Sequence, residues 1–70
     1  MNRGRLAAAL DLSEDKEFQV WITGEEQTKE YTFQFIMDFV GAKSENDFDD
    51  CGRAGFEFVS LMRDYDKRNV

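Results

Sequence analysis

Carboxylates are the most abundant side chains in this sequence that could take part in catalysis or ligand binding. Fifteen of the 70 residues are Asp or Glu, and the chain has no histidine and a single cysteine, Cys51. Acid–base catalysis needs carboxylates in a pocket that separates their pKa values, and a chain this short rarely encloses such a pocket. We therefore interpret the acidic run from Glu45 to Asp50 as a helix cap and a solvated loop, and we predict that the protein is not an enzyme.

The same acidic run is the best candidate for a metal site, but its spacing argues against one. A calcium loop that began at Asp47 would place Asp49 third and Gly52 sixth, yet its closing acid, at the twelfth position, would be Phe58. One thiol without histidine makes neither a zinc site nor an activated nucleophile. We expect no metal ion or other cofactor, and we interpret Cys51 as a buried, unreactive thiol.

The charge of the chain favours a basic partner. The formal net charge is −6, and residues 6–62 hold thirteen acidic and four basic side chains. A body this acidic repels phosphate backbones, so we expect no direct binding of nucleic acid, and it suits a protein with a basic surface. No run approaches the ~20 apolar residues of a membrane-spanning helix. With one cysteine and no recognisable targeting segment, we expect a cytoplasmic protein.

The patterning of residues predicts a single α+β domain over residues 1–70. Residues 5–12 are rich in helix formers and predict a short N-terminal helix. Residues 17–23 alternate, which predicts a strand with Phe18, Val20 and Ile22 toward the core and with Glu17, Gln19, Trp21 and Thr23 on the other side.

The segment 27–42 fits two patterns. Tyr31, Phe33, Phe35 and Met37 continue a period of two, which predicts a second strand over about 27–33 and thus a β-hairpin. A helical face made of Phe35, Ile36, Phe39 and Val40 then predicts a helix over about 34–42, with Gly41 near its C-cap. In the alternative, Thr23 and Glu26 form a capping box that starts one long helix and leaves a single strand.

The last segment predicts a helix over about 47–66, capped by Ser44 or Asp47. At 100° per residue, one face is apolar: Phe48, Cys51, Ala54, Phe58, Val59, Leu61, Met62 and Tyr65. The opposite face holds Asp49, Asp50, Arg53, Glu57, Ser60 and Asp64, and Phe56 points off the apolar face. Gly52 and Gly55 are unfavourable inside a helix, so we expect a break near Gly52 or close packing of another element against these glycines.

Two resemblances bear on function. In size and charge the chain is similar to small acidic proteins of phages and mobile elements, including anti-CRISPR proteins and other DNA mimics, which implies an inhibitor that occupies a basic nucleic-acid-binding surface. The strand–helix–helix alternative over about 17–68 resembles the ribbon–helix–helix family, which implies a homodimeric regulator. Its outward strand residues Glu17, Gln19, Trp21 and Thr23 include no basic side chain, unlike a strand that reads DNA. A small accessory or structural subunit is the third interpretation.

We predict a partner-binding surface that combines acids with one aromatic anchor. Trp21 is either an exposed anchor, as is common at interfaces, or is covered by Leu6, Leu10 and Leu12. The predicted binding residues are Trp21, Glu25, Glu26, Asp47, Asp49, Asp50, Glu57 and Asp64.

Overall fold

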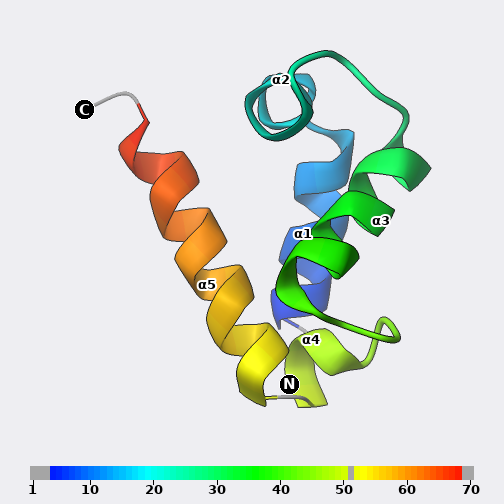
Figure 1. Cartoon of the computed structure of the whole chain (residues 1–70), viewed down its shortest axis with the longest axis vertical. Coiled ribbons are helices and arrows are strands. Elements are labelled where there is room, and N and C mark those ends of the chain that lie inside the picture. Colours follow the sequence, from blue (N-terminus) through cyan, green and yellow to red (C-terminus); the bar gives the residue numbers. More distant parts are fainter. Residues whose placement is uncertain (1–3, 51, 69–70) are drawn as a thin grey trace.

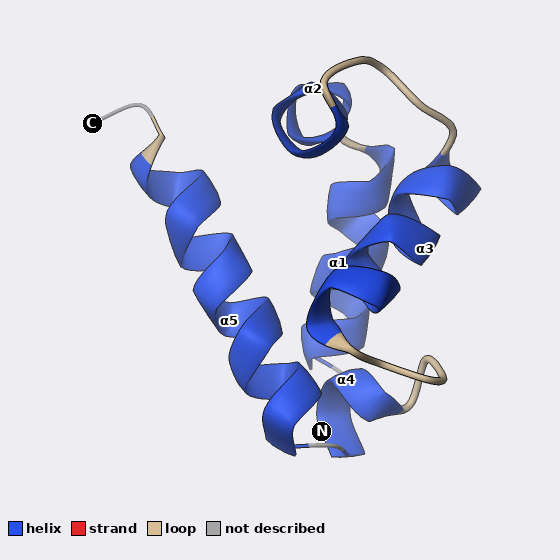
Figure 2. Cartoon of the chain, in the orientation of Figure 1, coloured by secondary structure: helices blue, strands red, loops and turns tan. Residues whose placement is uncertain are grey.

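The computed structural model describes residues 4–50 and 52–68, and within them it contains five helices and no strand (Figures 1 and 2). The helices are α1 (Gly4–Glu14), α2 (Lys16–Thr23), α3 (Lys29–Val40), α4 (Asp47–Asp50) and α5 (Gly52–Lys67). The predicted α+β fold is therefore wrong. Residues 17–23 lie in α2, and residues 27–33 form a loop and the start of α3, so neither the hairpin nor the strand of a ribbon–helix–helix layout is formed.

The helix α2 forms because local contacts outweigh the alternating pattern. The Asp15 carboxylate accepts hydrogen bonds from the backbone N–H groups of Glu17 and Phe18, at 2.9 and 3.4 Å, and so caps the helix. Gln19, predicted to point to solvent, is buried, and its amide bridges the Ser13 carbonyl and the Gln27 N–H. Val20, predicted to be in the core, is exposed instead.

The helix α3 begins and ends at capping residues. Thr28 Oγ1 accepts a hydrogen bond from the Tyr31 N–H at 3.0 Å, whereas Thr23, the cap in the alternative of one long helix, is the last residue of α2. Gly41 ends the helix with φ of 77°, a left-handed conformation that glycine adopts without strain. The helix predicted over about 34–42 is thus confirmed for residues 34–40, with Gly41 at its C-cap, and it starts five residues earlier than expected.

The predicted C-terminal helix is divided into α4 and α5. Cys51, between these two helices, lies outside the described residues, and so does the prediction that its thiol is buried. A Cβ atom on Gly55 would lie 2.8 Å from Arg5 Nε and 3.1 Å from the Phe48 carbonyl oxygen, so the expected close packing against a glycine is confirmed there. Most of the predicted apolar face is buried, namely Phe48, Ala54, Phe58, Leu61 and Tyr65, and Phe56 points into solvent.

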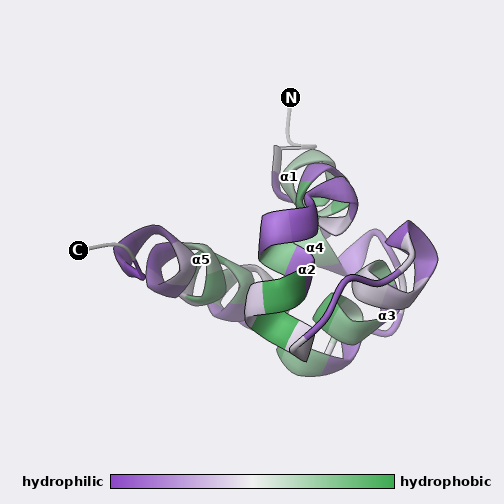
Figure 3. Ribbon diagram, turned by 90° about the horizontal axis from the view of Figure 1, so that it is seen from above, coloured by the Kyte–Doolittle hydropathy of each residue, from purple (hydrophilic) through white to green (hydrophobic). Residues whose placement is uncertain are grey.

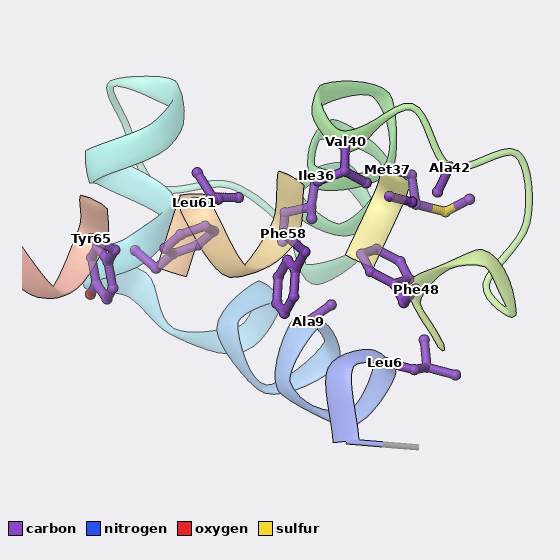
Figure 4. Packing of buried hydrophobic residues seen from close by; sticks show 12 residues of the cluster. Leu6, Ala9, Ile36, Met37, Val40, Ala42, Phe48, Phe58, Leu61 and Tyr65 are labelled. Atoms are coloured by element: carbon purple, nitrogen blue, oxygen red, sulfur yellow. The ribbon is translucent and has the colours of Figure 1, made fainter. Parts of the chain in front are cut away.

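Aromatic side chains fill the core. The rings of Phe33 and Phe58 lie 5.7 and 5.4 Å from the ring of Phe48, centroid to centroid. Figure 4 shows Phe58 between Ala9 of α1 and Ile36 of α3. Phe48 and Phe58 are fully buried, and full burial of a Phe side chain contributes about 1.5–3 kcal/mol, so these two rings help to stabilise so small a chain in the way that a disulfide otherwise would.

The arrangement of the helices places α2 and α4 at opposite ends of the molecule (Figure 1). The helix α1 packs chiefly against α3, and α5 packs against α4 and α3. As a result, the C-terminal end of α3 lies beside the first turns of α5, and this junction forms the largest hollow described below.

Candidate protein-binding surface

Trp21 lies on α2 and is partly covered by two other aromatic rings. Its ring centroid is 5.8 Å from that of Phe18 and 5.2 Å from that of Tyr65 on α5, and 37% of the residue remains exposed. The exposure of Trp21 is therefore intermediate between the two predicted states, an exposed anchor and a covered side chain. Burial, and secondly the negative charge of Asp15, raise the pKa of the neighbouring Tyr65 phenol.

Glu25 and Glu26 lie in the exposed loop between α2 and α3, which Figure 3 shows as mainly hydrophilic. Glu26 Oε1 is 3.8 Å from Lys16 Nζ, and Glu25 Oε2 accepts a hydrogen bond from the Gln27 side chain at 3.3 Å. Both carboxylates remain accessible to a partner, because the ion pair is weak at an exposed site.

Two of the three predicted acids of α4 accept hydrogen bonds from backbone N–H groups of other segments. The Asp49 carboxylate accepts hydrogen bonds from the backbone N–H groups of Arg5 and Leu6, at 3.3 and 3.4 Å, and so caps α1 from another helix. Asp47 Oδ2 accepts one from the Lys43 N–H at 2.8 Å and thereby closes the loop before α4, rather than capping it. Asp50 is exposed.

The predicted residues do not form one continuous surface. Trp21, Glu25 and Glu26 lie at the α2 end of the molecule, and the acids of α4 lie at the opposite end (Figure 1). Glu57 and Asp64 lie on α5 between these ends; Asp64 is exposed, and Glu57 is half-buried in a groove.

This groove is the feature that the sequence did not reveal. It has a volume of about 390 Å³ and is lined from α3 and its C-cap by Asp38, Phe39, Val40 and Gly41, and from α5 by Arg53, Ala54 and Glu57. Phe39, predicted to share the core face with Ile36 and Val40, is instead 55% exposed. The groove therefore has an aromatic wall, two carboxylates and one guanidinium.

A stripe of aromatic residues continues the groove along the outer side of α3. Tyr31, Phe35 and Phe39 recur every four residues, and a second, shallower hollow of about 150 Å³ is lined by Tyr31, Gln34, Phe35 and Asp38. Asp38 borders both hollows, so they adjoin. We call this surface the α3–α5 face and define it as Tyr31, Gln34, Phe35, Asp38, Phe39, Arg53 and Glu57.

The i, i+4, i+8 spacing of Tyr31, Phe35 and Phe39 was the signal that could have located this face. The same residues also fit a period of two, and as a strand they would have pointed to one side of a sheet. Only a helix places the three aromatic residues next to a row of polar residues at the same spacing, Glu30, Gln34 and Asp38.

Among the charged side chains of the described residues, carboxylates outnumber cations. Eight cations and fifteen carboxylates lie among them. Four ion pairs join described residues: Arg5–Asp49, Lys16–Glu26, Lys29–Glu14 and Arg68–Glu17. No carboxylate of the α3–α5 face takes part in these pairs. In the part of the chain that the structure describes, no group of three or more potential ligands is arranged to hold a metal ion.

None of the described helices combines the length and the apolar composition that crossing a bilayer requires.

No protein-family model, no curated protein and no solved structure matches the chain.

Proposed function

We propose that this protein is a non-enzymatic binding protein that occupies a basic surface of another protein. The partner we favour is a nucleic-acid-handling protein of the cytoplasm, inhibited because carboxylates of this chain take the positions of nucleic-acid phosphates. The chain itself binds neither nucleic acid nor a membrane in this proposal.

The excess of uncompensated carboxylates is the observation that supports this proposal. Ion pairs between described residues engage four carboxylates, which leaves eleven others against four remaining described cations. Repulsion among surplus charges destabilises a compact chain, and a cationic partner relieves it. Complementary charge also speeds encounter and discriminates between partners.

A pull-down with a DNA competitor tests the proposal. Tagged protein is incubated with nuclease-treated lysate of the native host, and bound proteins are identified by mass spectrometry after washes at low and at high salt. We expect a basic protein that handles nucleic acid, that leaves at high salt and that added duplex DNA or RNA displaces.

A matched variant makes the pull-down specific. Glu25→Gln, Glu45→Gln and Asp50→Asn combined remove three exposed charges that make no ion pair between described residues, and this variant should recover less of the partner. If no protein is retained at low salt, or if the retained protein is indifferent to nucleic acid and to neutralisation, the proposal is wrong.

A further inference from the structure

We propose that the α3–α5 face is the docking site for an amphipathic helix of the partner, with an apolar anchor beside Phe39 and basic residues opposite Asp38 and Glu57. This inference rests on the proposed function and adds to it the surface and the kind of segment that binds.

The aromatic stripe provides the apolar part of the site. Tyr31 is 53% and Phe39 55% exposed, although such rings usually contribute to a core or an interface. From Tyr31 to Phe39 the stripe spans about 12 Å of helix, at 1.5 Å per residue. That length fits two to three turns of a second helix, whose anchors would recur at the same spacing.

The groove provides a place for one anchor. The groove has a volume of about 390 Å³ and adjoins the second hollow at Asp38. Phe39 lines the groove and is also the last residue of the aromatic stripe. Because Gly41 has no side chain and ends α3, the backbone of the C-cap forms part of the groove wall. An anchor seated there would lose water contact on several sides, as binding hot spots do.

Charge identifies the chemistry of the occupant. Asp38 and Glu57 line the groove from opposite helices, and Glu30 lies one turn before Gln34 in the polar row of α3. A second copy of this chain would bring another net charge of −6 to an already acidic face, so we favour a basic helix over self-association. Arg53, the one cation in the groove lining, would select an acid or a carbonyl oxygen at one position of that helix.

Phe56 supplies a matched control on the same molecule. It is 69% exposed on α5, one residue before Glu57, yet it lines neither hollow. Phe39→Ala and Phe56→Ala therefore remove the same side chain from two exposed positions, only one of which belongs to the α3–α5 face.

A selection from displayed helical peptides tests the inference. A library of peptides of about 18 residues, roughly 27 Å long as helices, is selected on the wild-type protein, and the enriched peptides are measured by fluorescence anisotropy. We expect enriched peptides that carry net positive charge and apolar residues at i, i+3 or i+4. Phe39→Ala should raise the Kd by about tenfold or more, and Phe56→Ala by less than about twofold. Asp38→Asn with Glu57→Gln should raise the Kd and flatten its salt dependence.

Several outcomes would overturn the inference. These are failure to enrich any peptide, enrichment of neutral or acidic peptides, and equal effects of the two Phe substitutions. Sedimentation of the free protein tests whether a second copy of the chain occupies the face. A dimer that Phe39→Ala converts to a monomer would assign the face to that second copy. If the partner from the pull-down still binds Phe39→Ala with unchanged affinity, the proposed function stands and the α3–α5 face is not its site.

Discussion

At the scale of single residues, Asp49 and Asp50 are adjacent carboxylates with different roles: the first stabilises the fold, and the second is accessible to a partner. Its side chain is 13% exposed and accepts backbone hydrogen bonds at the start of α1, whereas the neighbouring Asp50 is exposed and makes no ion pair with a described residue. The first of these predicted binding residues is therefore better explained by stability, and the second is free for binding.

Substitution of the two aspartates distinguishes these roles. Asp49→Ala should lower the free energy of unfolding by about 1 kcal/mol, as loss of a helix cap does, and Asp50→Ala should change it by less than about 0.5 kcal/mol. Urea denaturation followed by circular dichroism gives both values. Equal losses would mean that the hydrogen bonds from Arg5 and Leu6 contribute nothing.

Gly55 is a second residue whose type is set by another helix. Alanine there would improve helix propensity by about 1 kcal/mol, but its Cβ would displace the Arg5 side chain, whose Nε donates a 2.6 Å hydrogen bond to the Phe48 carbonyl. That oxygen is backbone and lies only 3.1 Å from the new atom. We expect Gly55→Ala to destabilise the protein by about 1 kcal/mol net, since overpacking of this kind costs roughly 1–3 kcal/mol.

A double-mutant cycle in urea denaturation checks the Gly55 argument. In an Arg5→Ala background the obstruction is reduced, so Gly55→Ala should be less costly there than in the wild type. Gly52→Ala is the control, because a Cβ atom at Gly52 meets nothing within 4 Å. A stabilising effect of Gly55→Ala in the wild type would contradict the close packing.

At the scale of elements, sequence patterns predicted the long C-terminal helix well but wrongly assigned strands to the short helix α2 and to the start of α3. Most of the apolar face of α5 was predicted correctly, because 16 residues sample the 3.6-residue period several times; Val59, predicted on that face, is exposed instead. The eight residues of α2 sample it about twice, so alternation and helical periodicity fit equally well. The deciding contacts, the Asp15 cap and the buried Gln19 amide, depend on neighbours that a periodicity count ignores.

The candidate site was predictable only in its charge. The acidic excess follows from composition, but the α3–α5 face needs two facts that composition lacks: that Tyr31, Phe35 and Phe39 are on a helix, and that the C-terminal end of this helix meets α5. The second fact depends on packing between segments more than ten residues apart, which composition does not report.

The attachment of α2 depends on the C-terminal end of α5, and alkaline pH should weaken it. The Tyr65 ring packs edge-on against Phe18 at 5.0 Å, Arg68 lies 3.6 Å above that ring, and Arg68 Nη2 pairs with Glu17 at 2.7 Å. An isolated helix as short as α2 is unstable in water, so these contacts, together with its packing against α1, hold it in place.

The pH dependence follows from the Tyr65 phenol. Its pKa is raised by burial, so the unfolded chain loses this proton at a lower pH than the folded chain does. Stability should therefore fall as the pH rises above about 10, the ordinary tyrosine pKa. Tyr65 Oη makes no hydrogen bond to a described residue, so Tyr65→Phe should change stability at neutral pH by less than about 1 kcal/mol and lose less of it at alkaline pH. Urea denaturation at neutral and alkaline pH measures this difference, and parallel losses in both proteins would rule out the phenol as the cause.

At the scale of the whole molecule, surplus negative charge should make the fold more stable in salt. Eleven carboxylates lie outside the four described ion pairs, and repulsion among them is screened as the Debye length falls from about 10 Å at 0.1 M to about 3 Å at 1 M salt. The same salt weakens the ion pairs, but exposed pairs contribute only about 0–1 kcal/mol each. Repulsion should therefore dominate, and the melting temperature should rise by roughly 5 °C with sodium chloride, a salt without the strong exclusion effect of sulfate.

A neutralised variant separates screening from other effects of salt. Glu25→Gln, Glu45→Gln and Asp50→Asn combined reduce the formal net charge from −6 to −3 without removing an ion pair between described residues. This variant should melt at a higher temperature than the wild type at low salt and should gain less from added salt, because less repulsion remains to be screened. If the melting temperature of the wild type falls with salt, the ion pairs outweigh the repulsion. The surplus charge would then place no strain on the free protein for a basic partner to relieve.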